Sequence, residues 1–282
     1  MQKGARMEED TMDAEPNEKA GRGTLSAAVW GAAVGDALGV PYEFKPRGTF
    51  DCRGMVGHGT HDQPAGTWSD DTALMLATCD SIRAVGRVDA ADLLARFRSW
   101  YEDGAYTPDG VVFDVGNATA EALRTGRGLA GEWDNGNGSL MRIAPLAFCA
   151  ATDDEVRAAS AVTHAHPTST GACVEFVHLL REAAADPQGT RERLKSELAG
   201  MPRDEVRSGG YVLDTLRAAK WCFANTNDYR DCVLAAVNLG SDTDTTACVA
   251  GALAGTAYGK GAIPAEWLDA MRGGDVLEAT LF

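Results

Sequence analysis

Two short strings of acidic and hydroxyl side chains carry the strongest chemical signal in the sequence. They are Ser69-Asp70-Asp71-Thr72 and Ser241-Asp242-Thr243-Asp244-Thr245-Thr246, and each directly precedes an apolar, helical pattern. Ser, Thr and Asp are favoured helix N-caps and acids complement the positive helix end, so capping alone is one interpretation. One cap needs only one such residue, however, and adjacent carboxylates repel each other. A bound cation would relieve that repulsion.

The ligand chemistry of both strings favours a hard cation. All candidate ligands are oxygen atoms, without Cys or His, which indicates Mg²⁺, Mn²⁺ or Ca²⁺ rather than zinc. An EF-hand loop starting at Asp242 would need Gly and Glu where the sequence has Ala247 and Leu253. The DxDxT nucleophile motif of haloacid-dehalogenase-like phosphotransferases should end a strand near the start of an α/β domain. Here DTDTT follows a helical pattern near the C-terminus.

Three further segments contain residues suited to substrate binding. The loop 134–139, Asp-Asn-Gly-Asn-Gly-Ser, precedes a helical pattern. Free N–H groups there can hold a phosphate without a basic side chain, whereas a plain turn with Ser139 as N-cap is the simpler alternative. Asp114 and Asn117 either point the same way from a turn or only cap a helix. In the string 163–167, Thr-His-Ala-His-Pro, a third metal ligand is missing, so a polar substrate contact or a local cap is favoured.

Composition excludes several classes of function. The net charge of -15 repels phosphate backbones and anionic lipids, which excludes nucleic-acid or membrane binding by a basic patch. No apolar run approaches the roughly 18 to 20 residues of a membrane helix. The seven cysteines include no CxxC pair and the start has no apolar h-region, so free thiols in the cytoplasm are expected. The Gly-x-Ser-x-Gly motif, which carries the nucleophile of many serine hydrolases, is absent. His58 and His61 lie in a loop, and the sequence assigns no clear role to either.

The elements that must position these residues are predicted to be helical. Leu93, Leu94, Phe97 and Trp100 show the apolar spacing of a helix, whereas only 51–56 and 110–115 are weak strand candidates. Residues 1–23 are expected to form a disordered tail, with Thr24 as the first N-cap. The sequence therefore predicts one compact all-α domain over 24–282. Its predicted helices are 25–39, 71–85, 89–101, 118–124, 139–150, 153–162, 169–184, 191–198, 211–224, 229–237, 245–258 and 264–271.

Two of these predicted helices contain a stripe of glycines. Glycine inside a helix costs about 1 kcal/mol relative to alanine, so a stripe needs a compensating cause. We expect close packing of both helices at the centre of the bundle, although some of these glycines could instead be C-caps. The stripes are Gly31, Gly35 and Gly39 in the first helix, and Gly251, Gly255 and Gly259 in the second.

Taken together, the strings resemble the ADP-ribosylglycohydrolase family. The matching pieces run in order from about Leu25 to Gly259. They are GAAVGDALGVPYEF, GTWSDDTALML, FDVGNAT, NGNGSLMRIAPLA, THAHP and NLGSDTDTTACVAGALAG. Each piece alone is weak, but six in this order are highly specific. The resemblance implies an orthogonal bundle of roughly a dozen helices with two Mg²⁺ or Mn²⁺ ions in a central cleft.

The resemblance also implies roles for individual residues. The family commonly has threonine where Ser69 stands, and serine keeps the ligand oxygen. Glu43 would be a further ligand or a catalytic carboxylate, and Asp70 and Asp244 would also be catalytic. The implied metal ligands are Ser69, Asp70, Asp71, Asp242, Asp244 and Thr245. The implied substrate contacts are Asp114 and Asn117 near the ribose, Gly136, Asn137, Gly138 and Ser139 around ADP-ribose, and His164.

The implied reaction is hydrolysis of the glycosidic bond that joins ADP-ribose to an acceptor. Bond cleavage develops oxocarbenium character, which carboxylates stabilise, and a two-metal site can activate water near neutral pH. The expected partner is an ADP-ribosylated protein or a small ADP-ribose conjugate. Arginine is favoured over serine or acetyl linkages. A catalytically silent ADP-ribose-binding protein is the alternative, as in lens crystallin relatives, and the full carboxylate set argues against it. A monomer fits the sequence, which assigns no oligomeric state.

Overall fold

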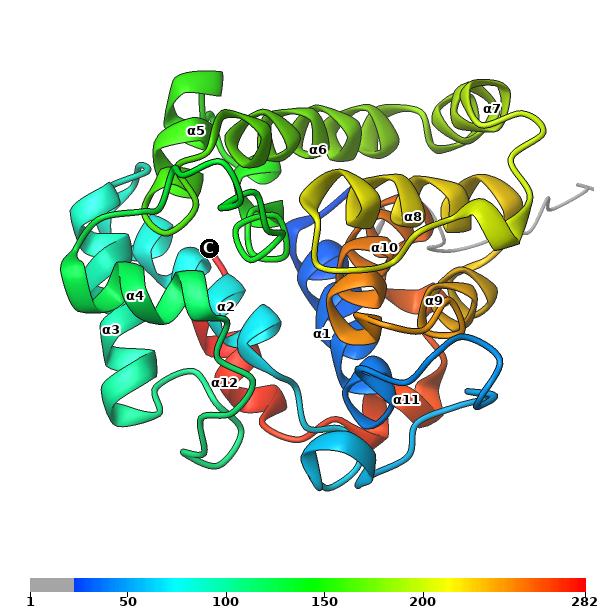
Figure 1. The fold of residues 1–282 in the computed structure, drawn as a ribbon, viewed down its shortest axis with the longest axis horizontal. Coiled ribbons are helices and arrows are strands. Elements are labelled where there is room, and N and C mark those ends of the chain that lie inside the picture. Colours follow the sequence, from blue (N-terminus) through cyan, green and yellow to red (C-terminus); the bar gives the residue numbers. More distant parts are fainter. Residues whose placement is uncertain (1–22) are drawn as a thin grey trace, which may run out of the picture.

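The computed structural model describes residues 23–282, so the predicted tail at 1–23 lies almost wholly outside the described residues. Within them the regular structure is helical and no strand is present, which confirms the predicted all-α fold (Figure 1). The candidate strands at 51–56 and 110–115 are irregular segments. The α-helices are α1 (Leu25–Gly39), α2 (Asp70–Val85), α3 (Ala90–Asp103), α4 (Asn117–Thr125), α5 (Asp153–Ala161), α6 (Pro167–Ala185), α7 (Pro187–Glu197), α8 (Val212–Asn225), α9 (Tyr229–Val237), α10 (Thr243–Tyr258), α11 (Ala265–Ala270) and α12 (Gly274–Thr280).

Capping residues set where several helices begin. The Thr24 hydroxyl accepts a hydrogen bond from the Ala27 N–H at 3.2 Å, as predicted for the start of α1. Ser69 caps α2 and Asp89 caps α3 in the same way. These residues satisfy N–H groups that have no partner inside the helix. None of the described helices combines the length and apolar character that a bilayer crossing requires.

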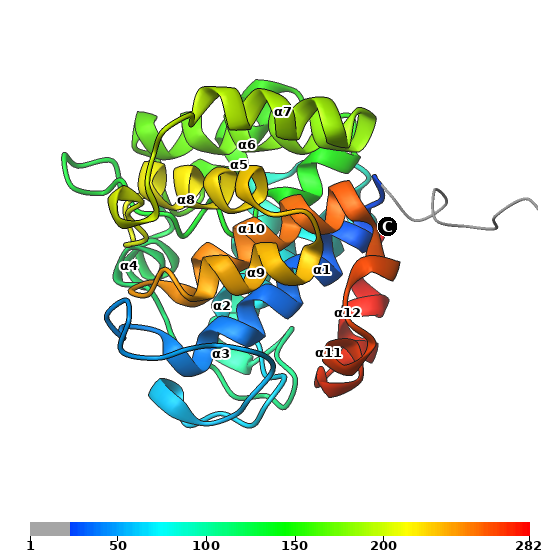
Figure 2. The same ribbon diagram turned by 90° about the vertical axis from the view of Figure 1, so that its right-hand side faces the viewer.

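Helices α1 and α10 pack directly against each other at the centre of the molecule, and both views show them side by side (Figures 1 and 2). A Cβ atom added to Gly31 would lie 2.3 Å from the Gly251 carbonyl oxygen, and one added to Gly35 would lie 2.1 Å from that of Ala247. The expected close packing is therefore confirmed. Gly259 is the exception, because it ends α10 with φ of 87°. We call this backbone-to-backbone contact between α1 and α10 the glycine seam.

Replacing Gly31 by Ala is expected to lower the free energy of unfolding by about 3 kcal/mol, because the new methyl group overlaps backbone that cannot retreat. The matched control is Gly171, which lies in α6 and has nothing within 4 Å of an added Cβ. Gly171→Ala should raise stability by about 0.5–1 kcal/mol through helix propensity. Urea unfolding followed by circular dichroism measures both variants. Equal midpoints for Gly31→Ala and the wild type would refute the close contact.

One predicted helix is wrong, and one helix is missed. Residues 139–150 form turns and a short 3-10 helix, Ala144–Phe148, instead of an α-helix. The cause is tertiary: Arg142 is fully buried and donates to the Ala159 carbonyl at 3.2 Å and to the Thr163 hydroxyl at 2.8 Å. Pro145 also lacks the N–H that a regular helix needs. The short helix α12, at the end of the chain, was not predicted.

Candidate functional site

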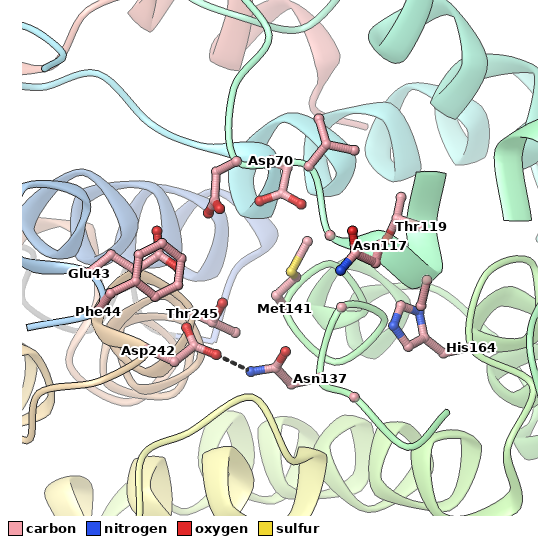
Figure 3. Close-up of a pocket in the computed structure, with 16 residues that line it drawn as sticks. Glu43, Phe44, Asp70, Asn117, Thr119, Asn137, Met141, His164, Asp242 and Thr245 are labelled. Atoms are coloured by element: carbon pink, nitrogen blue, oxygen red, sulfur yellow. Dashed lines mark hydrogen bonds between the residues drawn. The ribbon is translucent and has the colours of Figure 1, made fainter. Parts of the chain in front are cut away.

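Three helix N-termini meet at one pocket of about 360 Å³ (Figure 3). They are the N-termini of α2, α4 and α10. The partial positive charge at each of these ends favours carboxylates and phosphates close by. Most residues singled out in the sequence line this pocket. They are Glu43, Asp70, Asp114, Asn117, Gly136, Asn137, Gly138, His164, Asp242 and Thr245.

The two acidic strings, which lie far apart in sequence, come together beneath the pocket. The Thr245 hydroxyl donates to Asp71 Oδ2 at 3.3 Å, although the two residues are 174 positions apart. Ser69 donates to the same oxygen at 3.1 Å. Asp71 and Asp244 are fully buried. The glycine seam explains the convergence, since Gly39 lies against the backbone of Asp244 and its carbonyl accepts from the Thr243 hydroxyl at 2.8 Å.

Several of the buried carboxylate oxygens have no protein partner. Asp71 Oδ1, Asp242 Oδ1 and Asp244 Oδ2 accept no hydrogen bond from any residue of the described range, 23–282. A buried carboxylate without a partner is costly, and a cation would compensate it. Independently, Glu43, His61, Asp114 and Asp244 each place one ligand atom within 4.8 Å of the others. The donor set is mainly carboxylate oxygen, which fits a hard divalent cation.

Burial and mutual repulsion raise the pKa values of this cluster. Burial is the main cause for Asp70, Asp71 and Asp244, whose pKa values lie well above the usual range, and the neighbouring carboxylates add to it. Burial also raises the pKa of Glu43 to about 7, while its hydrogen bond with His61 opposes that shift. Gathering these acids is therefore unfavourable in the metal-free protein, and a positive ion would reverse that balance.

His61 is part of the site although its sequence context gave no assignment. Its Nε2 is hydrogen-bonded to Glu43 Oε2, and its ring lies 5.2 Å from that of Phe113 and 6.1 Å from that of Phe44. The hydroxyl of Thr60 holds the same loop by donating to the Glu43 carbonyl at 2.6 Å. No sequence signal identifies His61, because its loop reaches Glu43 only through the tertiary fold.

Asp36 of α1 is a second residue that the sequence analysis missed. It is fully buried and accepts hydrogen bonds from the Ser69 N–H at 3.0 Å, the Thr72 N–H at 3.0 Å and the Thr72 hydroxyl at 2.6 Å. It therefore caps α2 from a different helix and fixes the turn that carries Asp70 and Asp71. The available signal was a single acid within the apolar, glycine-rich sequence of α1.

Replacing Asp36 by Ala is expected to lower the free energy of unfolding by about 3 kcal/mol, because two N–H groups and one hydroxyl lose their acceptor in the interior. Asp36→Asn should cost less, since it keeps one acceptor oxygen. Thermal and urea unfolding of the two variants provides the measurement. A loss that is the same for Ala and Asn would contradict the capping role of this side chain.

The other end of the pocket is built from neutral groups. Gly116, the N-cap of α4, makes no side-chain cap, and residues 116–119 line the pocket. His164 is buried, and burial lowers its pKa to about 3, so its imidazole is neutral. The Thr163 hydroxyl, which accepts from Arg142, lies 2.8 Å from His164 Nδ1. Donation by that hydroxyl leaves the proton on Nε2, which faces Gly138.

Two residues of the glycine-rich loop make hydrogen bonds within the protein, and only Asn137 of the two also lines the pocket. The Asn137 amide donates to Asp242 Oδ2 at 2.8 Å and to the Thr215 hydroxyl at 2.9 Å, so it orients Asp242 (Figure 3). Ser139 lies outside the pocket lining and is fully buried, and its hydroxyl accepts from Ser160 at 2.8 Å. The chain turns inward after Gly138, which explains why Ser139 faces the core.

Comparison with known proteins gives the family. The family model for ADP-ribosylglycohydrolases matches residues 21–281, nearly the whole chain. The chain belongs to the ADP-ribosylglycohydrolase family. The ADP-ribosylarginine hydrolase Tri1 of Pseudomonas putida (strain GB-1) is 37% identical, and the alignment covers 86% of this chain and 72% of that protein. The resemblance drawn from the six motifs is thus confirmed, and the chain is an enzyme of this family.

Two further relatives of the ADP-ribosylglycohydrolase family are similar over most of their length. The ADP-ribosyl-[dinitrogen reductase] glycohydrolase of Rhodospirillum rubrum is 32% identical, with 86% of this chain and 87% of that protein covered. A solved structure described as an ADP-ribosylglycohydrolase-related protein complex superposes with a TM-score of 0.75 at 36% identity. It covers 93% of this chain and 96% of its own.

Proposed function

We propose that this protein hydrolyses the N-glycosidic bond between ADP-ribose and arginine on a modified protein, and that the reaction requires two divalent cations, Mg²⁺ or Mn²⁺. The observation that carries the proposal is the convergence of carboxylates from both acidic strings at and beneath one pocket, where Asp71, Asp242 and Asp244 each keep one buried oxygen without a hydrogen-bond partner. The arginine linkage is supported by the relatives named as ADP-ribosylarginine hydrolases, which are 37% and 34% identical to this chain. Residues 24–282 would form the catalytic domain.

The division of the pocket fits the two halves of such a substrate. The neutral end, with the N-terminus of α4, Gly136, Gly138 and His164, would offer N–H donors to the diphosphate and ribose. The acidic end, with Glu43, Asp70 and Asp242, would surround the anomeric carbon and the cationic guanidinium. An acidic protein can therefore bind a diphosphate without a basic side chain in the pocket.

The cation ligands that we propose are carboxylate and hydroxyl oxygens from both strings. Bound divalent cations would orient the ribose hydroxyls, act as Lewis acids and lower the pKa of water near the anomeric carbon. Glu43, His61 and Asp114 lie close enough to join them. The proposed set is Ser69, Asp70, Asp71, Asp242, Asp244 and Thr245.

The chain's own residues would divide the remaining chemistry. Glu43 lies beside the anomeric end of the pocket, and His61 keeps its carboxyl in place through a hydrogen bond; burial raises the pKa of this carboxyl to about 7 in the cation-free protein. It is the group that we propose for general acid–base catalysis. Asp70 and Asp244 would stabilise the positive charge that develops on the ribose as the bond breaks. Asn137 would hold Asp242 through the 2.8 Å hydrogen bond.

The test is incubation of the purified full chain with arginine-linked and serine-linked ADP-ribosylated peptides, in Mg²⁺, in Mn²⁺ and in EDTA. Mass spectrometry of the products identifies the bond that is cut. We expect ADP-ribose to be released from arginine in the presence of either cation and not in EDTA. Binding of ADP-ribose without any release would instead identify a catalytically silent protein, and release only from serine would overturn the arginine linkage.

A further inference from the structure

Phe44 is an exposed aromatic residue at the acidic end of the pocket. It directly follows Glu43 and lines the pocket, yet 67% of its surface is exposed. Its φ angle is 62°, in the left-handed region. Bulky residues rarely adopt this region, and such strain persists only where the surrounding structure enforces it. Neither capping nor core packing accounts for this ring, since it faces solvent.

The strained conformation is held by a neighbouring loop that carries the second acidic string. The Phe44 N–H donates to the Ser241 carbonyl at 2.7 Å, and the Ser241 N–H donates to the Lys45 carbonyl at 2.9 Å. Ser241 has a φ of 64° and directly precedes Asp242. Arg47 also fixes this segment by donating to the Leu239 carbonyl at 2.8 Å. The ring of Phe44 is therefore presented from a fixed backbone beside Glu43 and Asp242.

The charge around Phe44 suits a cation. Six carboxylates gather here, so two divalent cations, with four positive charges, would still leave the site negative. They are Glu43, Asp70, Asp71, Asp114, Asp242 and Asp244. This end of the pocket repels a diphosphate, and Figure 3 shows Phe44 across the pocket from Asn117 and His164. The part of a substrate that projects past Phe44 is therefore the acceptor, not the ADP portion.

We propose that Phe44 is a specificity-determining residue that binds the guanidinium of the acceptor arginine against the face of its ring. The inference rests on the proposed function, because it names the residue that recognises the acceptor in that same site. An aromatic face attracts a planar cation, and the adjacent carboxylates add to the attraction. A serine or acetyl acceptor is neutral, so it gains neither the attraction to the aromatic face nor the attraction to the carboxylates.

The experiment compares Phe44→Leu, which keeps apolar bulk, with Phe44→Tyr, which keeps the ring. Leu and Tyr, like Phe, carry one CH₂ group at Cβ and branch only at Cγ, so neither substitution adds bulk next to the strained backbone. Both variants should therefore fold as the wild type does. We expect Phe44→Leu to raise KM for an ADP-ribosyl-arginine peptide roughly tenfold, and Phe44→Tyr to stay within about twofold of the wild type. Affinity for ADP-ribose, which lacks the acceptor, should not change in either variant when it is measured by calorimetry.

Tyr101→Ala is the matched control, since Tyr101 is a partly exposed aromatic residue on α3 that does not line the pocket. This substitution should change neither KM for the ADP-ribosyl-arginine peptide nor the affinity for ADP-ribose. The inference is overturned if Phe44→Leu leaves KM unchanged, or if it weakens ADP-ribose binding by the same factor. Cleavage of the arginine linkage by the wild type in that experiment keeps the proposed function intact. Absence of arginine cleavage by the wild type would overturn both.

Discussion

Asp70→Asn and Asp244→Asn are each expected to lower turnover of an ADP-ribosyl-arginine substrate by a factor on the order of 10² to 10⁴. Each change removes a buried negative charge from the cluster that we propose to hold the cations and to stabilise the transition state. The amide is nearly the same size as the carboxyl, so packing is preserved. Steady-state kinetics at saturating Mg²⁺ or Mn²⁺ measures the effect, and titration calorimetry measures cation affinity in the same samples.

The stability of these variants separates loss of chemistry from loss of fold. Without cations, Asp70→Asn should unfold at a temperature equal to or above that of the wild type, because the pKa of Asp70 is raised by burial and by neighbouring acids. Removing such a charge relieves repulsion. Asp154→Asn, at an exposed acid in the first turn of α5, is the control that should leave turnover unchanged and lower the melting temperature only slightly, because one charge that complements the helix dipole is lost. Wild-type turnover of either pocket variant with Mg²⁺ present would refute the proposed ligand set.

The second large effect expected is loss of stability when divalent cations are removed. A ligand that binds only the folded state stabilises it by about 2.7 kcal/mol at a hundredfold excess over its Kd. We therefore expect EDTA to lower the melting temperature at neutral pH, and Mg²⁺ or Mn²⁺ to restore it. Calorimetry of the full chain provides the measurement. An identical melting temperature with and without cations would contradict a cation site in this cluster.

Without cations, the stability of the folded state should fall as pH rises from about 4 to about 7, whereas the stability of an ordinary acid-labile protein rises over this range. Burial raises the pKa of Asp36 to about 6 and that of Glu43 to about 7, whereas both titrate near 4 in an unfolded chain. The folded state then binds more protons than the unfolded state in this window, so these groups destabilise it as pH rises from about 4 to about 7. Cations should cancel the effect by favouring the charged carboxylates. A stability in EDTA that rises across this window would contradict the shifts.

The parts of the site that the sequence predicted are those with local signals. Hydroxyl and acidic residues just before apolar helical patterns indicated the starts of α2 and α10, because such residues favour helix N-termini through contacts with the first turn of the same helix. The glycine stripes indicated the central helix pair. Glycine destabilises a helix interior, so its repetition at helical spacing indicates a compensating close contact with another helix. Motif order then identified the family, which the comparison with known proteins confirms.

The residues that escaped prediction act through tertiary contacts. Asp36 caps a helix 33 residues away, and His61 meets Glu43 only because a loop folds over the pocket. Residues 139–150 do not form the predicted α-helix, because the buried Arg142 side chain bonds to groups in the core instead. Ser139 carries a family motif position but faces inward. Local sequence periodicity predicts none of these contacts, because each joins segments that are distant in the sequence.

The glycine seam has a consequence for the making of the protein in the cell. Helix α1 is synthesised about 200 residues before α10, yet the two helices pack backbone to backbone. A growing polypeptide therefore leaves the ribosome with half of the acidic site built and the complementary half still untranslated. Because the proposed cation ligands include Asp242, Asp244 and Thr245, we expect translation products truncated before α10 to carry no enzyme activity.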